Sequence, residues 1–186
     1  MCFELIRLLH YIYRIPLSYG FGVQSPFAYS FIRKVVRGVN DSVLIDSLKG
    51  DKLGYSNRCI KVACLLYRFA SFINADVCFF SRDQYKEPWL SVARLASCKS
   101  MLVGDVCNPI KFAVISSAFD DLDFLLSIIA PDGMLVLMDI RKDAVSFSFW
   151  NQLVADTRTY VSFDLFDVGV VFFDSKMYKC QYCCNY

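Results

Sequence analysis

The chain has 186 residues, of which 56% are hydrophobic, 16% aromatic and 20% charged, and its formal net charge is +2. This length suits one domain with a sizeable core. The small net charge, with no block of lysine or arginine, argues against a nucleic-acid-binding protein. No apolar run reaches the length of about 18 residues that a membrane span needs, so we expect no transmembrane segment.

Residues 2–14 are predicted to form an amphipathic helix. Glu4, Arg7, His10 and Arg14 recur every three or four residues and form one polar stripe. Such a pattern does not resemble a secretory signal, so we expect a cytoplasmic protein. A helix packed on the domain or on a partner, most simply in a homodimer, fits the pattern better than a helix on a membrane surface.

The nine cysteines and the single histidine limit the chemistry of the chain. His10 belongs to the polar stripe, which argues against a Ser–His or Cys–His hydrolase. In a reducing compartment we expect most of the thiols to be buried as small apolar groups. The Cys180–Cys184 cluster has no assigned role, because a zinc site needs a second pair that only Cys59 and Cys64 would loosely supply. We therefore predict no metal site.

The stretch FGVQSPFAYSF, residues 21–31, predicts the start of a helix. Ser25 would cap the free N–H groups of the first turn, and Pro26 suits the first helical position. Apolar residues recur at helical spacing as far as residue 36, and Gly38 follows as a stop. Residues 38–57 hold three glycines and many turn formers, so they are predicted to be a connector with a short helical piece near 42–48.

From residue 58 onward a helix is followed by alternating strands and helices. Strands are predicted at 76–80, 100–103, 112–116, 134–138, 161–166, 168–173 and 178–183, and helices at 58–73, 88–97, 120–129 and 147–155, with a turn at 131–133. Continuous apolar strands that alternate with helices are typical of a parallel sheet covered on both faces. The strands at 161–166 and 168–173 are too close for a crossover and must pair antiparallel. We predict an α/β domain over 58–186 after an N-terminal helical segment and connector over 1–57, together forming one compact unit.

Small and polar residues stand at four of the predicted strand ends. They are Ser81, Arg82 and Asp83, then Gly104 and Asp105, then Ser116, and finally Asp139. In open α/β sheets ligands bind beyond the carboxyl ends of the strands, so the first six of these are candidate cofactor-binding residues. The competing interpretation is that strand ends are polar because they meet the surface.

Two motifs resemble one bacterial family of class I S-adenosylmethionine-dependent methyltransferases. Residues 21–27, FGVQSPF, are similar to the Gly-x-His-Ser-Pro-Phe signature that precedes the core of that family, with Gln24 in place of the histidine. Residues 164–173, DLFDVGVVFF, are similar to its closing hairpin, and Trp150 fits the preceding helix. The resemblance implies a Rossmann-like, mostly parallel sheet with a C-terminal antiparallel hairpin, and S-adenosylmethionine as the cofactor.

The middle of the chain departs from the pattern of this family. Its members carry an acidic residue and a glycine-rich turn after the first strand, because only glycine lets the backbone approach the ligand closely. Here residues 77–86, VCFFSRDQYK, hold no glycine, and Arg82 and Lys86 add bulk and charge. Asp105 would hold the ribose hydroxyls, but its segment is short, as if one strand–helix unit were missing. Asp139 keeps one of the paired acids that follow the fifth strand in the family.

Two functions of different classes follow from the resemblance. The missing glycines favour a methyltransferase-like protein without catalytic activity, a pseudoenzyme that serves as a binding or scaffolding module for itself or for an active paralogue. The alternative is an active small-molecule or O-methyltransferase with an atypical cofactor site, in which Asp139 or Tyr19 would orient an unidentified acceptor. A third interpretation places another, anionic ligand in the same crevice, beside Arg82 and Lys86.

Two structural expectations test the strand assignment and the role of the first motif. The strand assignment requires four residues to be fully buried: Phe79, Val114, Leu135 and Val171. If the motif is a lid over the crevice, Ser25 and Phe27 should pack near Ser81 or Asp139.

Overall fold

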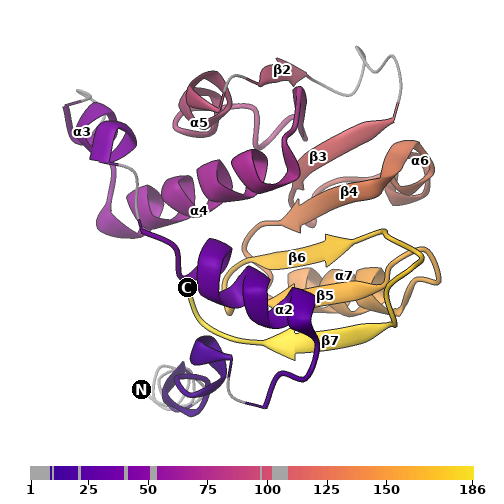
Figure 1. Ribbon diagram of the computed structural model, residues 1–186. Helices are drawn as coiled ribbons and strands as arrows, with labels where there is room; N and C mark the ends of the chain where they lie inside the picture. The colour runs from indigo at the N-terminus through magenta and orange to yellow at the C-terminus, as the bar shows by residue number, and fades with distance from the viewer. Residues whose placement is uncertain are drawn as a thin grey trace.

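A computed structural model describes residues 9, 11–20, 22–39, 42–50, 54–96, 98–101 and 109–186. In this part of the chain, seven strands form one mixed sheet in the order β2-β1-β3-β4-β6-β5-β7 (Figure 1). They are β1 (Val77–Phe80), β2 (Lys99–Met101), β3 (Ile110–Ile115), β4 (Ile129–Leu137), β5 (Val161–Asp164), β6 (Gly169–Phe172) and β7 (Cys180–Cys183). Of these strands, β6 alone runs antiparallel to its neighbours, as expected for the close pair β5–β6.

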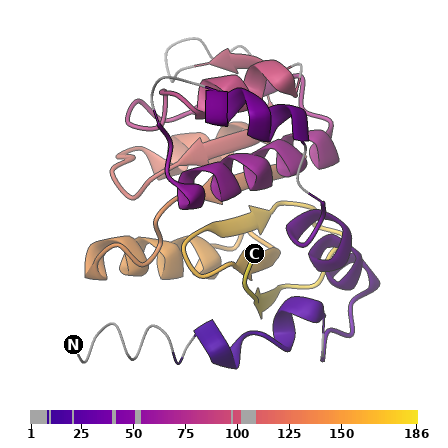
Figure 2. The same ribbon diagram turned by 90° about the vertical axis from the view of Figure 1, so that its left-hand side faces the viewer.

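The helices cover the two faces of the sheet. They are η1 (Leu17–Tyr19), α2 (Pro26–Phe31), η2 (Ile32–Val36), α3 (Ser42–Gly50), α4 (Asn57–Ile73), α5 (Trp89–Leu95), α6 (Leu122–Ile128) and α7 (Ala144–Ala155). Helices α2, α4 and α5 pack on one face, and α6 and α7 on the other (Figures 1 and 2). None of the helices in the described residues is long and apolar enough to cross a membrane.

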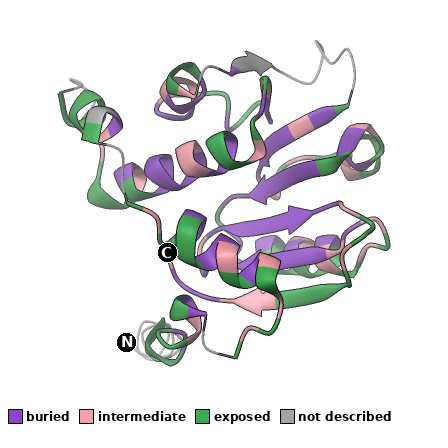
Figure 3. Ribbon diagram, viewed as in Figure 1, coloured by how far each residue is buried: buried purple, intermediate pink, exposed green. Residues whose placement is uncertain are grey.

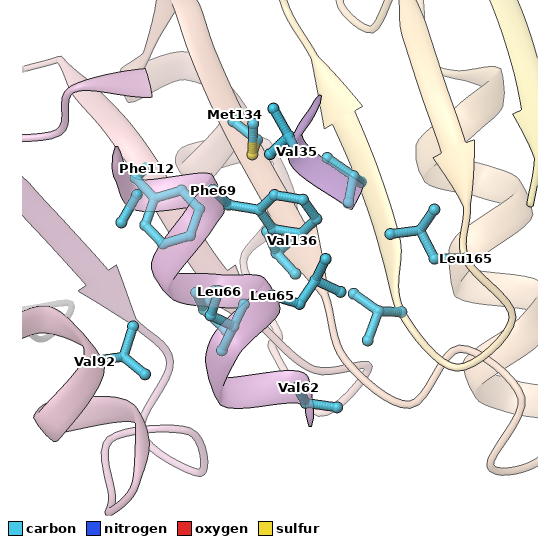
Figure 4. Packing of buried hydrophobic residues seen from close by; sticks show 14 of the residues in the cluster. Val35, Val62, Leu65, Leu66, Phe69, Val92, Phe112, Met134, Val136 and Leu165 are labelled. Carbon is cyan, nitrogen blue, oxygen red and sulfur yellow. The ribbon is translucent and has the colours of Figure 1, made fainter. Parts of the chain in front are cut away.

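Side chains that alternate along the strands build a separate core on each face of the sheet. Along β4, Met134 and Val136 belong to the cluster under α4, whereas Leu135 and Leu137 belong to the cluster under α6 and α7. Figure 4 shows Phe69 of α4 close to the side chains of the first pair. Most residues of the central strands are buried, with exceptions such as Lys111 in β3 and the exposed Pro131 and Asp132 in β4 (Figure 3).

The four burial predictions are confirmed, because Phe79, Val114, Leu135 and Val171 are each at most 1% exposed. The predicted helices and strands are present within the described residues, with ends shifted by a few positions. Of the predicted 2–14 helix, residues 9 and 11–13 are helical, Arg14 lies in a turn, and the other positions lie outside the described residues. The predicted division at residue 57 stays a prediction.

The turn predicted at 131–133 is wrong, because these residues belong to β4. The pairing of β3 with β4 moves from Ile110 opposite Ile129 to Phe112 opposite Met134, so β4 carries three extra residues in an irregular bulge. A Cβ atom on Gly133 would lie 2.8 Å from the carbonyl oxygen of Ala130, so glycine suits the tight path of the chain here. The local Pro-Asp-Gly sequence signals the bend correctly but not that pairing continues through it.

The start of α2 matches its prediction, but the expected lid is wrong. Ser25 caps the helix by accepting a hydrogen bond from Ala28 N at 3.3 Å. The ring of Phe27 packs on Phe172, with centroids 5.1 Å apart, and Phe172 pairs with Met134 near the amino end of the parallel strands. Asp139 follows Met134 by five residues, a distance of about 17 Å along a strand. The FGVQSPF motif is therefore a helix cap that anchors α2 to the core.

Candidate functional site

The strand order reverses between β1 and β3, and this is where an open α/β sheet places a ligand crevice. The chain leaves β1 for β2 on one side and returns to β3 on the other. Phe80 and Ile115 end the two strands, so Ser81 and Ser116 follow at the same edge of the sheet. The structure thus brings these two predicted residues together.

Asp83 lies at the centre of a hydrogen-bond network at this edge. Ser81 Oγ donates to one carboxylate oxygen at 2.6 Å, and Gln84 Nε2 donates to the other at 2.7 Å. The Trp89 indole N–H donates in turn to Gln84 Oε1 at 3.1 Å. Burial alone would raise the pKa of Asp83, but hydrogen bonds from Ser81, Ser116 and Gln84 lower it below its usual value. Asp83 is therefore an ionised group whose oxygens already have donors.

The backbone of the turn after β1 is also bonded internally. Ser81 N donates to Val114 O at 3.0 Å, and the N–H groups of Gln84 and Tyr85 donate to Ser81 O at 2.8 and 2.9 Å. Arg82, the remaining candidate in this turn, is exposed to solvent. The turn therefore folds onto itself, and at least three of its N–H groups are not free to bind a ligand.

The described residues do not fit S-adenosylmethionine in the manner that the resemblance implies. A close approach of the cofactor needs a glycine-rich turn, but residues 77–86 hold no glycine. The side chains of Ser81, Asp83 and Gln84 satisfy one another instead. Gly104 and Asp105, the other predicted cofactor-binding residues, lie outside the described residues.

Asp139 contacts residues other than the Asp83 network. It follows β4 with a positive φ of 53°, a conformation that residues other than glycine rarely adopt. Arg58 Nη2 donates to Asp139 Oδ1 at 3.2 Å and lies 3.3 Å from Asp167 Oδ2. Since the Arg58 and Asp139 side chains are 56% and 52% exposed, this ion pair contributes little to stability. Asp139 thus faces an arginine from α4, and no sequence signal indicated this partner.

Tyr19, the second residue considered as a catalytic candidate, pairs with Arg37. The Arg37 guanidinium lies 4.3 Å from the centroid of the Tyr19 ring, and its Nη2 donates to the Tyr19 hydroxyl at 3.0 Å. Both Tyr19 and Asp139 therefore contact arginines, but not the same one. The structure does not assemble them into one catalytic pair through these contacts.

Two pockets open beside the amino-terminal part of α4, a feature that the sequence did not reveal. Each has a volume of about 210 Å³, and Lys61 and Tyr186 line both. Arg58 lines the first, and Arg37 and Arg68 line the second. We call these two pockets together the α4 groove. Its α4 cations Arg58, Lys61 and Arg68 are three and seven residues apart in sequence, which predicts that they share one face of the helix. This spacing does not predict a pocket.

Asp164 forms a buried ion cluster with two arginines at the same edge. Its side chain is 4% exposed. Its Oδ1 accepts a hydrogen bond from Arg14 Nη1 at 2.8 Å and another from Arg141 Nη1 at 2.7 Å. Phe166 N donates to the same oxygen at 2.9 Å. These bonds satisfy the carboxylate within the protein, which makes the cluster a structural feature.

The cysteine cluster shows no sign of metal binding in the described residues. No group of three or more potential ligands lies together in that part of the chain. Cys180 is exposed, Cys183 is half-buried, and burial raises the pKa of Cys184 to about 12. A thiol with a raised pKa is a poor ligand and nucleophile near neutral pH.

Comparisons with known proteins add no assignment. No protein-family model matches the chain, and a search of curated proteins gives no significant match.

Proposed function

We propose that this protein is a methyltransferase-like α/β protein without methyl-transfer activity that serves as a binding module. The observation that carries the proposal is the Asp83 network. Ser81, Asp83 and Gln84 occupy the turn that would hold the cofactor, and their polar groups bond to one another. A ligand with the polar groups of S-adenosylmethionine would have to break these bonds and would gain no glycine cradle.

The arrangement of the sheet supports the family part of the proposal. The antiparallel strand β6 lies between β4 and β5, as a hairpin added after the last helix α7. Only β2 extends the described sheet beyond β1, in agreement with a missing strand–helix unit. The residues of the two resembling motifs have structural roles, since Ser25 caps α2 and Asp164 holds the arginine cluster. The resemblance is thus strongest where residues stabilise the fold and weakest where they would hold the cofactor.

A second copy of the chain is the simplest partner. Leu9, Ile12 and Tyr13 are exposed in the N-terminal segment, and Tyr13 is 78% exposed. Exposed apolar side chains close together on one segment are typical of an interaction surface. Sedimentation should show a dimer that Ile12→Asp weakens, whereas a monomer at high concentration would exclude this partner.

Calorimetric titration with S-adenosylmethionine and S-adenosylhomocysteine tests the loss of the cofactor. We expect no binding heat at millimolar ligand. Micromolar binding that Asp83→Ala or Asp105→Ala weakens would contradict the proposal and would support the active methyltransferase. Asp132→Ala is the matched control, because Asp132 is an exposed acid in the bulge at the amino end of β4, paired with Lys111 at 3.1 Å.

A further inference from the structure

The α4 groove joins two pockets of different chemistry. One pocket is lined by Val36, Arg37, Gly38, Lys61, Arg68 and Tyr186. The side chains that line it include three cations and no carboxylate. The adjoining pocket includes Tyr11, Leu165 and Phe166, and its charges are Arg58, Lys61 and Asp167. The groove therefore has a cationic end and an aromatic end.

Contacts within the protein hold two of the guanidinium groups at the cationic end. Arg68 Nε donates to Val35 O at 2.7 Å and Nη2 donates to Val36 O at 3.1 Å. Arg37 lies over the ring of Tyr19 and donates to its hydroxyl. Side chains that are already fixed lose less conformational entropy when a ligand binds. The cationic end is thus partly preorganised for binding.

The cationic end suits a doubly charged anion better than a singly charged one. Arg37, Lys61 and Arg68 bring three positive charges to one pocket of about 210 Å³. A phosphate monoester carries a charge of about −1.5 to −2 near pH 7 and offers three acceptor oxygens. Cationic side chains form charge-assisted hydrogen bonds with such oxygens. A carboxylate would neutralise fewer of these charges.

The aromatic end suits the organic part of the same ligand. Tyr11 and Phe166 pack edge to face, with centroids 5.9 Å apart, and provide an apolar wall. Tyr186 lines both pockets. Burial and the charge of Asp167 raise the pKa of its hydroxyl to about 12, and a neutral hydroxyl can donate a hydrogen bond to a phosphate ester oxygen.

We infer that the α4 groove binds a small aromatic phosphate ester, with the phosphate at Arg37, Lys61 and Arg68 and the ring against Tyr11 and Phe166. This inference gives a ligand class to the binding module proposed above. It places that ligand on residues that do not include those of the Asp83 turn. The proposed phosphate site therefore does not use the predicted cofactor-binding residues.

Calorimetry with phenyl phosphate and with inorganic phosphate tests the inference on the full chain. We expect phenyl phosphate to bind more tightly than inorganic phosphate. Lys61→Ala should weaken the binding of both by about tenfold, through loss of one charge-assisted contact. Tyr11→Leu should weaken phenyl phosphate alone. Alanine is well tolerated on an exposed helical position, so Lys61→Ala should still fold, which its thermal melting curve will verify.

Lys34→Ala is the matched control, because Lys34 is exposed on η2 beside Arg37 but does not line the groove. Equal effects of Lys34→Ala and Lys61→Ala would overturn the inference, as would the absence of phenyl phosphate binding. Equal affinity for the two phosphates would overturn the role of the aromatic end. Failure of the proposed function has a different signature, namely cofactor binding that responds to Asp83→Ala and not to Lys61→Ala.

Discussion

The guanidinium of Arg14 lies on the carboxylate of Asp164 across 150 residues of sequence, with Nη1 2.8 Å from Oδ1 and Nη2 3.1 Å from Oδ2. Arg141 binds the same carboxylate from the segment before α7. The ring of Phe166 lies 5.6 Å and 5.3 Å from the two guanidinium carbons. One acid thus joins the N-terminal segment, the end of β5 and the loop after β4.

Asp164→Asn should strongly destabilise the protein. The amide removes the negative charge and leaves two arginines without their counter-ion in a buried site. Breaking a buried pair in this way costs about 3–5 kcal/mol of unfolding free energy. Urea denaturation measures the loss. The control is Asp123→Asn, since Asp123 is exposed where it pairs with Arg158 and should change stability by less than about 1 kcal/mol.

The stability of the protein should fall as the solution becomes acidic. Burial alone would raise the pKa of Asp164, but hydrogen bonds and charge from Arg141 and Arg14 lower it overall. A carboxyl with a lowered folded-state pKa stabilises fully above its unfolded pKa of about 3.9, and the contribution is lost as pH falls toward the folded value. Denaturation curves between pH 7 and pH 3 should show this loss. If the unfolding free energy of Asp164→Asn falls as steeply below pH 4 as that of the unchanged protein, the acid sensitivity comes from other carboxyl groups.

Gly169→Ala should destabilise the sheet, because a Cβ atom there would lie 2.4 Å from a ring carbon of Trp150. Overpacking of this kind costs about 1–3 kcal/mol. Adding Trp150→Leu should recover part of the loss, and thermal melting of the three variants measures the coupling. Gly50→Ala is the control, since nothing lies within 4 Å of its Cβ position and the change should be neutral or slightly stabilising.

Gln84→Met should cost about 1–3 kcal/mol of unfolding free energy, because it leaves the buried indole N–H of Trp89 without its acceptor. It also removes one donor from Asp83, whose pKa should then rise toward its usual value. Chemical denaturation gives the energy, and NMR titration of the carboxyl gives the pKa. Gln152→Met on the exposed face of α7 should have little effect, and a similar loss there would contradict the role given to Gln84.

Local signals account for the parts of the structure that the sequence predicts well. Ser25 and Pro26 predict the start of α2, and the residue that Ser25 caps is only three positions away. The apolar run around Val114 predicts a buried strand. Short spacing between β5 and β6 forces their antiparallel pairing. In each case the deciding residues are neighbours in sequence.

The candidate site was predicted only in part, because its partners come from distant segments. Ser81 and Asp83 are two positions apart and do meet, with Ser116 beside them. Asp139 faces Arg58, which is 81 residues away and belongs to a helix that gave no signal for this contact. The α4 groove is formed by residues from η2, from α4, from the turn between β5 and β6, and by Tyr186 after β7. No periodicity within one of these segments predicts that they come together.

Ser18 and Asn185 are joined by a hydrogen bond of 2.6 Å that spans 167 residues, and Phe31 of α2 packs on Phe163 and Phe172 of the closing hairpin. During synthesis on the ribosome, α2 therefore emerges long before the strands that it covers. Until those strands are synthesised, the apolar face of α2 is not covered by them. Intermediates with exposed apolar surface bind chaperones and tend to aggregate. Contacts between segments so far apart also predict slow folding. The first helices of this protein are made early but complete their packing last.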